Sequence, residues 1–154
     1  MNFLSLVVIF SSVDQLTKYL IISNLSYGQV VPINSWLNLV YYKNSGFIFG
    51  LFSDYNSDYI FIFHFIIFIL ATYLILKIYY DDKTLKLISS LLLAGAIGNS
   101  FDRFFLNGVV DFIDFYYKDF HWPAFNFADL FISLGIILFL LESLRRLNIV
   151  YRNS

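Results

Sequence analysis

The chain has 154 residues, of which 59% are hydrophobic, 21% are aromatic and 14% are charged. A soluble domain of this length carries about a quarter charged residues, so this chain has too few polar side chains to cover a surface that faces water. The net charge of −1 gives no electrostatic basis for nucleic-acid binding, and the absence of cysteine excludes disulfides, thiol catalysis and thiolate metal sites. These quantities indicate a small integral membrane protein, predicted as one domain over residues 1–154.

Four segments are apolar enough to cross a bilayer, which takes about 20 residues of helix. The expected spans are residues 2–22, 59–80, 85–105 and 128–147. The first is predicted to be retained rather than cleaved as a signal peptide, because it lacks a basic start and carries Asp14 and Lys18 where a signal peptide is apolar.

The outer segment 23–58 contains residues that favour strands. The β-branched and aromatic residues of 30–33 and 37–42 are bracketed by Gly28 and Gly46. The fold class predicted is therefore an all-α membrane protein with four transmembrane helices and a small extracytoplasmic sheet between the first and second. The segment 106–127 is interpreted only as a second long outer connection.

Lys and Arg side chains set the expected orientation, because cytoplasmic loops are enriched in them. One membrane face is flanked by Lys77, Lys83, Lys86, Arg145, Arg146 and Arg152, and the other by Lys18, Lys43, Arg103 and Lys118. Both termini are therefore predicted to be cytoplasmic.

Polar residues gather at the outer ends of the expected helices. Asp14 and Lys18 lie one helical turn apart, which permits an ion pair that eases insertion of the helix end. Asn126 is predicted to cap the last span and to place Asp129 in its first turn, where the helix dipole stabilises a carboxylate.

Asp102, Asp111 and Asp129 converge on the outer ends of two adjacent spans, with Asn99 on the same helix face as Asp102. Interfacial capping explains each of them singly, with Asp102 pairing Arg103, but explains the whole group poorly. Charged groups at membrane depth are costly and often mark function. Two carboxylates that share a proton can act as general base and general acid, which permits peptide hydrolysis without a metal.

Other hydrolytic chemistries find little support in the sequence. His64 and His121 do not form an H-E-x-x-H pattern, and no serine has a His or Lys at a recognisable spacing.

The polar segments resemble, in order, the conserved blocks of the lipoprotein signal peptidases (signal peptidase II). The matching segments are Asp14–Lys18, Asn44–Gly50, Gly95–Arg103, Val109–Phe112 and Phe125–Asp129. The resemblance implies an aspartic endopeptidase of the bacterial plasma membrane, with its active site near the outer face. Its substrates would be prolipoproteins that carry diacylglycerol, cut before the lipidated cysteine.

By the same resemblance, Asp111 and Asp129 would be the catalytic pair, with Asp102 in a supporting role. The residues expected to line or support the site are Asn44, Gly46, Asn99, Arg103, Asn126, Asp14 and Lys18. No cofactor and no metal is expected, and the partners expected are the prolipoprotein signal peptide and membrane lipid, bound by a monomer.

Two other classes of protein compete with this hypothesis. A carrier could use Asp102 and Asp129 as relay groups, although a transporter places its site near the midplane and these residues lie at one face. A helix-packing scaffold would use small residues such as Gly95 and Gly98, but leaves the aspartates unexplained.

Overall fold

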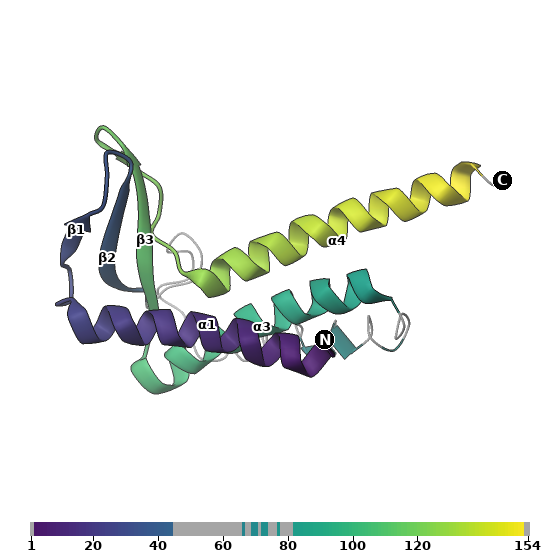
Figure 1. The fold of residues 1–154 in the computed structure, drawn as a ribbon, viewed down its shortest axis with the longest axis horizontal. Coiled ribbons are helices and arrows are strands. Elements are labelled where there is room, and N and C mark those ends of the chain that lie inside the picture. The colour runs from purple at the N-terminus through teal and green to yellow at the C-terminus, as the bar shows by residue number, and fades with distance from the viewer. Residues whose placement is uncertain are drawn as a thin grey trace.

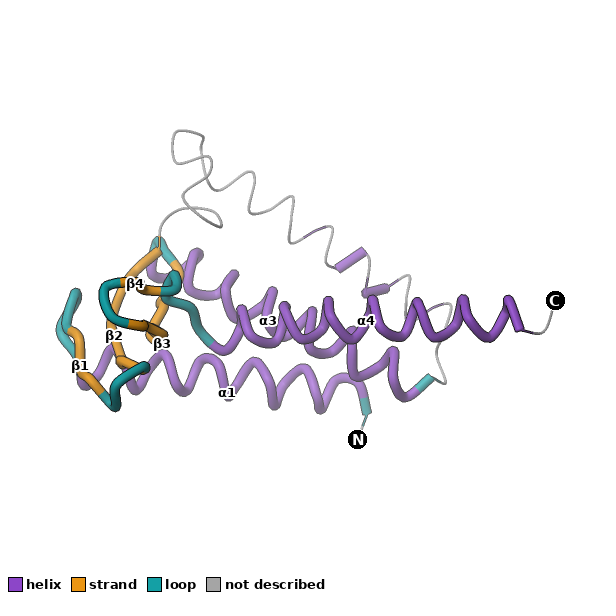
Figure 2. Tube along the Cα trace, turned by 90° about the horizontal axis from the view of Figure 1, so that it is seen from above, coloured by secondary structure: helices purple, strands orange, loops and turns teal. Residues whose placement is uncertain are grey.

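The computed structural model describes residues 2–44, 66, 69–70, 72–73, 77 and 82–152. Their elements are, in chain order, α1 (Phe3–Asn24), β1 (Val30–Pro32), β2 (Leu37–Asn44), α3 (Lys83–Leu106), β3 (Val109–Tyr117), β4 (Phe120–His121) and α4 (Phe127–Arg152). The three helices run alongside one another, with the strands at one end of the bundle (Figures 1 and 2). Both termini point away from the strands.

Three helices of the described part are long and apolar enough to cross a membrane. They are Phe3–Asn24, Lys83–Leu106 and Phe127–Ile149. These helices match the expected spans 2–22, 85–105 and 128–147. The expected span 59–80 and the outer residues 45–58, Gly46 included, lie largely outside the described residues.

Side chains cap the helices where the sequence changes from polar to apolar. Asn2 accepts a hydrogen bond from the Ser5 N–H at 2.8 Å, and Asp82 accepts one from the Leu85 N–H at 3.0 Å. These bonds satisfy backbone donors that have no partner within the first helical turn. α3 ends at Leu106 and is capped by Asn107, whose left-handed backbone (φ 54°) is tolerated by asparagine, and β3 begins two residues after this cap.

Two glycines allow α3 to approach its neighbours closely. A Cβ atom at Gly95 would lie 2.5 Å from the Ala128 carbonyl oxygen of α4, and one at Gly98 would collide with the Asp14 carboxylate of α1. The helices can reach these separations only because neither position carries a side chain.

The strands form one antiparallel sheet in the order β1-β2-β3-β4. β1 and β2 confirm the strands expected in the outer segment. β3 and β4 correct the expectation that 106–127 is only a connection, and they enlarge the small sheet that the fold class included. Residues 109–117 are rich in β-branched and aromatic side chains, and this run becomes a strand because β2 provides a paired edge along it, from Leu37↔Phe115 to Asn44↔Val109.

The sheet is fixed to the helix bundle by an apolar cluster and is distorted beside it. Ile21 of α1 packs with Val110 and Phe112 of β3. The register between β2 and β3 shifts between Leu39 and Tyr42, next to the Tyr42↔Asp111 pair. Such a bulge bends a strand and redirects its side chains.

Candidate functional site

The expected polar residues meet where α1, α3, β3 and the start of α4 converge, at the sheet end of the bundle. Their side chains form a continuous set of hydrogen bonds and charge interactions, contributed by Asp14, Lys18, Asn44, Asn99, Asp102, Arg103, Asp111, Asn126 and Asp129. Only Gly46 of the expected site lies outside the described residues.

Asn126 bridges Asp111 and Asp129. Its side-chain amide Nδ2 donates to Asp111 Oδ1 at 2.8 Å, and its backbone N–H donates to Asp129 Oδ2 at 3.2 Å. One residue thus holds a carboxylate of β3 beside a carboxylate of α4, although the two are 18 positions apart along the chain (129 minus 111).

The same contacts begin α4. The Asp129 N–H donates to Asn126 Oδ1 at 3.0 Å, so the two residues cap each other's backbone amides. This confirms the expected cap at Asn126 and the place of Asp129 in the first turn. The cap also fixes the Asn126 side chain, because its oxygen must face the Asp129 N–H and its NH₂ group must then face Asp111.

The two carboxylates have different surroundings. Asp111 is 4% exposed, whereas Asp129 is half-buried. Burial raises the pKa of Asp111 from 3.8 to about 7, and the negative charge of Asp129 adds to the rise. Hydrogen bonds from the Asn44 and Asn126 side chains act in the opposite direction on this pKa.

Asp129 receives its second side-chain contact from α3. Asn99 Nδ2 donates to Asp129 Oδ1 at 2.8 Å, so both oxygens of this carboxylate accept hydrogen bonds. Arg103, also on α3, interacts electrostatically with Asp129, Asp111 and Asp102.

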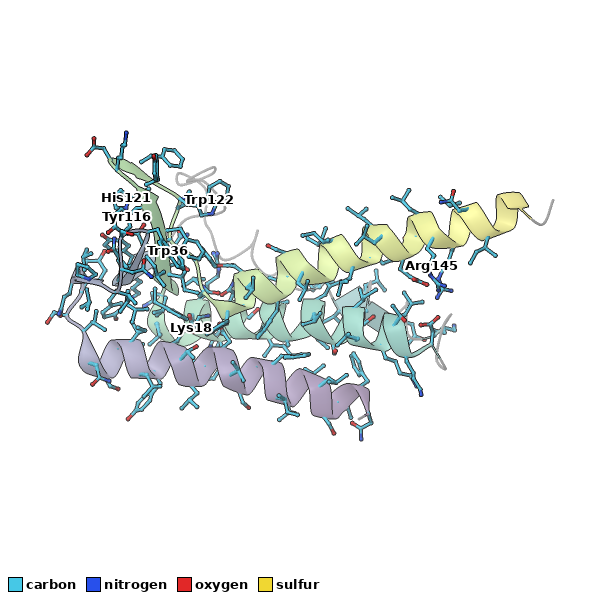
Figure 3. The ribbon with its side chains drawn as sticks, turned by 45° about the horizontal axis from the view of Figure 1, so that its top comes forward. Lys18, Trp36, Tyr116, His121, Trp122 and Arg145 are labelled. Carbon is cyan, nitrogen blue, oxygen red and sulfur yellow. The ribbon has the colours of Figure 1, made fainter. Side chains whose placement is uncertain are left out.

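Behind this pair lies a buried group that we call the Lys18 cluster, made up of Lys18, Asp14, Asp102, Asn99 and Gln15. Lys18 Nζ lies 2.8 Å from Asp14 Oδ2, 3.0 Å from Asp102 Oδ2 and 3.0 Å from Asn99 Oδ1. Lys18 is 1% exposed, and Figure 3 shows it between α1 and α3 toward the sheet. The carboxylate of Asp102 is therefore bound by Lys18, and Arg103 interacts with it electrostatically.

Each carboxylate of the Lys18 cluster also accepts a backbone N–H. Asp14 Oδ1 accepts from Ala128 at 2.8 Å, and Asp102 Oδ2 accepts from Val110 at 3.0 Å. Gln15, which the sequence places in a motif without a role, donates to Asp102 Oδ1 at 2.9 Å and to the Gly98 carbonyl at 3.1 Å. Its place in the cluster follows from α1 packing on α3, which no local pattern indicates.

The arrangement is suited to acid–base chemistry. It joins a buried carboxyl whose pKa is near neutrality to a half-exposed carboxylate that accepts two hydrogen bonds. Among the residues that the structure describes, no group of three or more His, Asp or Glu side chains is placed to hold a metal ion.

The fold and this site define a class of protein, the helical membrane enzymes of bacteria. Two solved structures described as bacterial membrane enzymes are similar to this chain, with TM-scores of 0.76 and 0.74 and sequence identities of 29% and 31%. They cover 94% and 92% of this chain, which covers 93% and 92% of theirs.

Sequence comparisons identify the family. The family model for signal peptidase (SPase) II matches residues 6–145. The lipoprotein signal peptidase of Thermodesulfovibrio yellowstonii is 43% identical over 87% of this chain and 88% of its own length, and that of Cupriavidus necator is 34% identical over 95% and 83%. The chain belongs to the lipoprotein signal peptidase (signal peptidase II) family and is an aspartic endopeptidase of a bacterial membrane. The carrier and scaffold interpretations are set aside.

Proposed function

We propose that Asp111 and Asp129 are the catalytic pair and that they activate a water molecule to hydrolyse the signal-peptide bond of a prolipoprotein. The observation that carries this proposal is the Asn126 bridge, which holds the two carboxylates together at the sheet end of the bundle. Asn126, Asn99, Arg103 and Asn44 then line the pair, and Asp102 stands behind it.

The difference in environment between Asp111 and Asp129 supports a division of roles between them. Asp111, with a pKa of about 7, holds the shared proton and donates it to the carbonyl oxygen of the scissile peptide. Asp129 accepts a proton from the attacking water and gives it to the leaving amine. As the C–N bond breaks and the C=O bond reforms, the hydroxyl returns its proton to Asp111, which restores the starting state. No covalent intermediate forms, because water attacks the carbonyl carbon directly.

The substrate we propose is a prolipoprotein that carries diacylglycerol on the cysteine next to the cleaved bond. The site lies at the end of three apolar helices, where a lipid-linked residue and an extended peptide can reach it together. We expect the chain to act as a monomer in the bacterial plasma membrane.

The test uses purified protein and a precursor peptide made with and without the diacylglyceryl group. We expect the wild type to cut only the lipidated peptide, before the modified cysteine, as mass spectrometry of both products will show. Asp111→Asn and Asp129→Asn should each lose about 100- to 10,000-fold in kcat, because each removes one partner of an acid–base pair.

Asp114→Asn is the matched control. Asp114 is a carboxyl of the same strand, 5% exposed, and accepts from Asn38 at 2.7 Å away from the pair. It should retain wild-type kcat. Full activity of Asp111→Asn or Asp129→Asn would reject the assigned pair.

We further propose that the sheet is extracytoplasmic and both termini are cytoplasmic. Support comes from the basic residues that flank the end opposite the strands and from both termini pointing away from the strands. The chain contains no cysteine, so Lys118→Cys and Lys83→Cys each introduce a single thiol. In intact spheroplasts a membrane-impermeant maleimide should label Cys at position 118 and not at 83, and the reverse would invert the topology.

A further inference from the structure

The Lys18 cluster carries an inference beyond the acid–base pair itself. Lys18 is fully buried, and its hydrogen bonds and ion pairs go to neither Asp111 nor Asp129, although its charge acts on Asp111 from a distance. Its three N–H donors meet three acceptors, the oxygens of Asp14, Asp102 and Asn99. Asn99 in turn contacts Asp129 itself, whereas Asp14 and Asp102 contact the residues that precede Asp129 and Asp111.

The contact between Lys18 and Asn99 determines which atom of the Asn99 side chain faces Asp129. An ammonium group has only donors, so the Asn99 atom that faces Lys18 must be the carbonyl oxygen Oδ1. The NH₂ group of Asn99 is then turned toward Asp129, to which it donates at 2.8 Å. Without a donor at position 18, the Asn99 side chain could turn its oxygen toward Asp129, which would repel the carboxylate.

The other two contacts of Lys18, with the carboxylates of Asp14 and Asp102, influence the backbone next to Asp129 and Asp111. Asp14 accepts the Ala128 N–H, which directly precedes Asp129, at 2.8 Å. Asp102 accepts the Val110 N–H, which directly precedes Asp111, at 3.0 Å. A single cation thus binds two anions, one next to each member of the pair.

We propose that Lys18 is a positioning residue: it orients the Asn99 amide toward Asp129 and sets the separation of the Asp111 and Asp129 backbones. This inference rests on the proposed function of Asp111 and Asp129. This role differs from that of a purely structural ion pair, because the geometry of Asp111 and Asp129 depends on Lys18 even when the fold is intact.

The first variant is Lys18→Met, which keeps the length of the side chain and removes all three donors. We expect kcat to fall about 10- to 100-fold, the usual weight of a charge-assisted hydrogen bond, while KM changes less than about twofold. The variant leaves two buried carboxylates without a cation, and such a change can prevent folding.

The second variant, Lys18→Met with Asp102→Asn, separates positioning from stability. It keeps the net charge of the cluster and lets the new amide accept the Val110 N–H, but it restores no donor to the Asn99 oxygen. We expect Tm in detergent to recover toward the wild-type value while kcat stays low. Recovery of kcat together with Tm would overturn the proposal, and so would failure of both variants to fold, since Lys18 would then serve stability alone.

A double-mutant cycle with Asn99→Leu gives the sharpest comparison. If Lys18 acts through Asn99, then Lys18→Met should reduce kcat much less in the Asn99→Leu background than in the wild type. Losses that simply multiply would overturn the proposal. A wild type that fails to cut the lipidated peptide would contradict the proposed function itself, which distinguishes the two failures.

Discussion

Charged side chains gather at both ends of the helix bundle, and the two groups are built differently. At the sheet end, Lys18 is 1% exposed and meets three acceptors from α1 and α3. At the other end lies what we call the Arg146 cluster, made up of Arg146, Arg145, Glu142 and Asp82, in which the Arg145 side chain is 61% exposed. Figure 3 shows Lys18 and Arg145 far apart along the bundle.

The contrast separates two uses of charge. In the Arg146 cluster, Glu142 accepts from the guanidinium groups of Arg145 and Arg146, and Arg146 also binds Asp82, the cap of α3. Glu142 is buried beneath the arginines, but the Arg145 side chain is exposed and those of Arg146 and Asp82 are partly exposed, so water and salt reach their charges and weaken the pairs. In the Lys18 cluster the three charged groups of Asp14, Lys18 and Asp102 are withdrawn from water, so removing one of them leaves its partners buried without compensation. The buried charges at the sheet end therefore hold neighbouring side chains in a fixed geometry. The charges at the other end mainly link and cap the ends of the helices.

Among the variants that test this contrast between the two ends of the bundle, Asn126→Leu should lower kcat the most. The substitution removes the amide that donates to Asp111 and the oxygen that caps Asp129, with little change in size. We expect kcat for the lipidated peptide to fall about 100-fold, because the side-chain hydrogen bond to the Asp111 carboxyl and the cap of the Asp129 backbone are lost together. Equal kcat in wild type and variant would deny Asn126 its bridging role.

Gly98→Ala should disturb the Lys18 cluster although Gly98 is not one of its members. The new methyl group would collide with the Asp14 carboxylate, which Lys18 and the Ala128 N–H hold from two sides. We expect the free energy of unfolding to fall by about 1–3 kcal/mol and kcat to fall with it.

Gly135→Ala is the matched control, because its methyl group would meet the apolar Leu92 side chain instead. It should lower Tm and leave kcat unchanged. Loss of stability without loss of kcat at Gly98 would show that the cluster does not influence the pair.

The pKa of Asp111 predicts a third effect, on pH dependence. Asp111 is protonated below about pH 7 and ionised above it, so kcat should decline above pH 7, approaching tenfold per pH unit. The raised pKa also means that the folded protein binds this proton more tightly than the unfolded chain. Stability should therefore decrease as pH rises from 3.8 to about 7.

Measurements of kcat and of Tm across this range check both expectations. Asp111→Asn provides the reference, since its Tm should lack this part of the pH dependence. A wild-type kcat that stays constant up to pH 9 would contradict the role of Asp111 as proton donor.

The smallest effect is expected from Arg146→Met. This variant removes the contacts to Asp82 and Glu142 at the far end of the bundle. We expect a small decrease in Tm, measurable at low salt and reduced at high salt, with kcat unchanged. A fall in kcat as large as that of Lys18→Met would erase the distinction between the two clusters.

The sequence predicted those parts of the fold that depend on local patterns. Helix α1 followed from its apolar length, β2 from its β-forming residues, and the start of α4 from Asn126. β3 was missed although its residues favour a strand, because the segment was interpreted by its polar residues and its partner β2 lies far away in the chain.

The sequence indicates which residues gather at the candidate site, but it indicates few of the contacts between them. The polar motifs named Asp14 and Lys18, and their spacing predicted the pair that the structure shows. The contact of Lys18 with Asp102 spans 84 positions (102 minus 18) and depends on how α1 packs on α3. Local spacing indicates only Arg103, the sequence neighbour of Asp102, which interacts with it electrostatically in addition to the Lys18 ion pair.

The most direct test of the account compares the single-turnover cleavage rates of Asp111→Asn, Asp129→Asn and the double variant on the lipidated peptide. If the two carboxylates share one proton and one water, either single substitution should cost nearly as much as both together. Losses that multiply in the double variant would mean that the two residues act independently, and the account of a joint acid–base pair would be wrong.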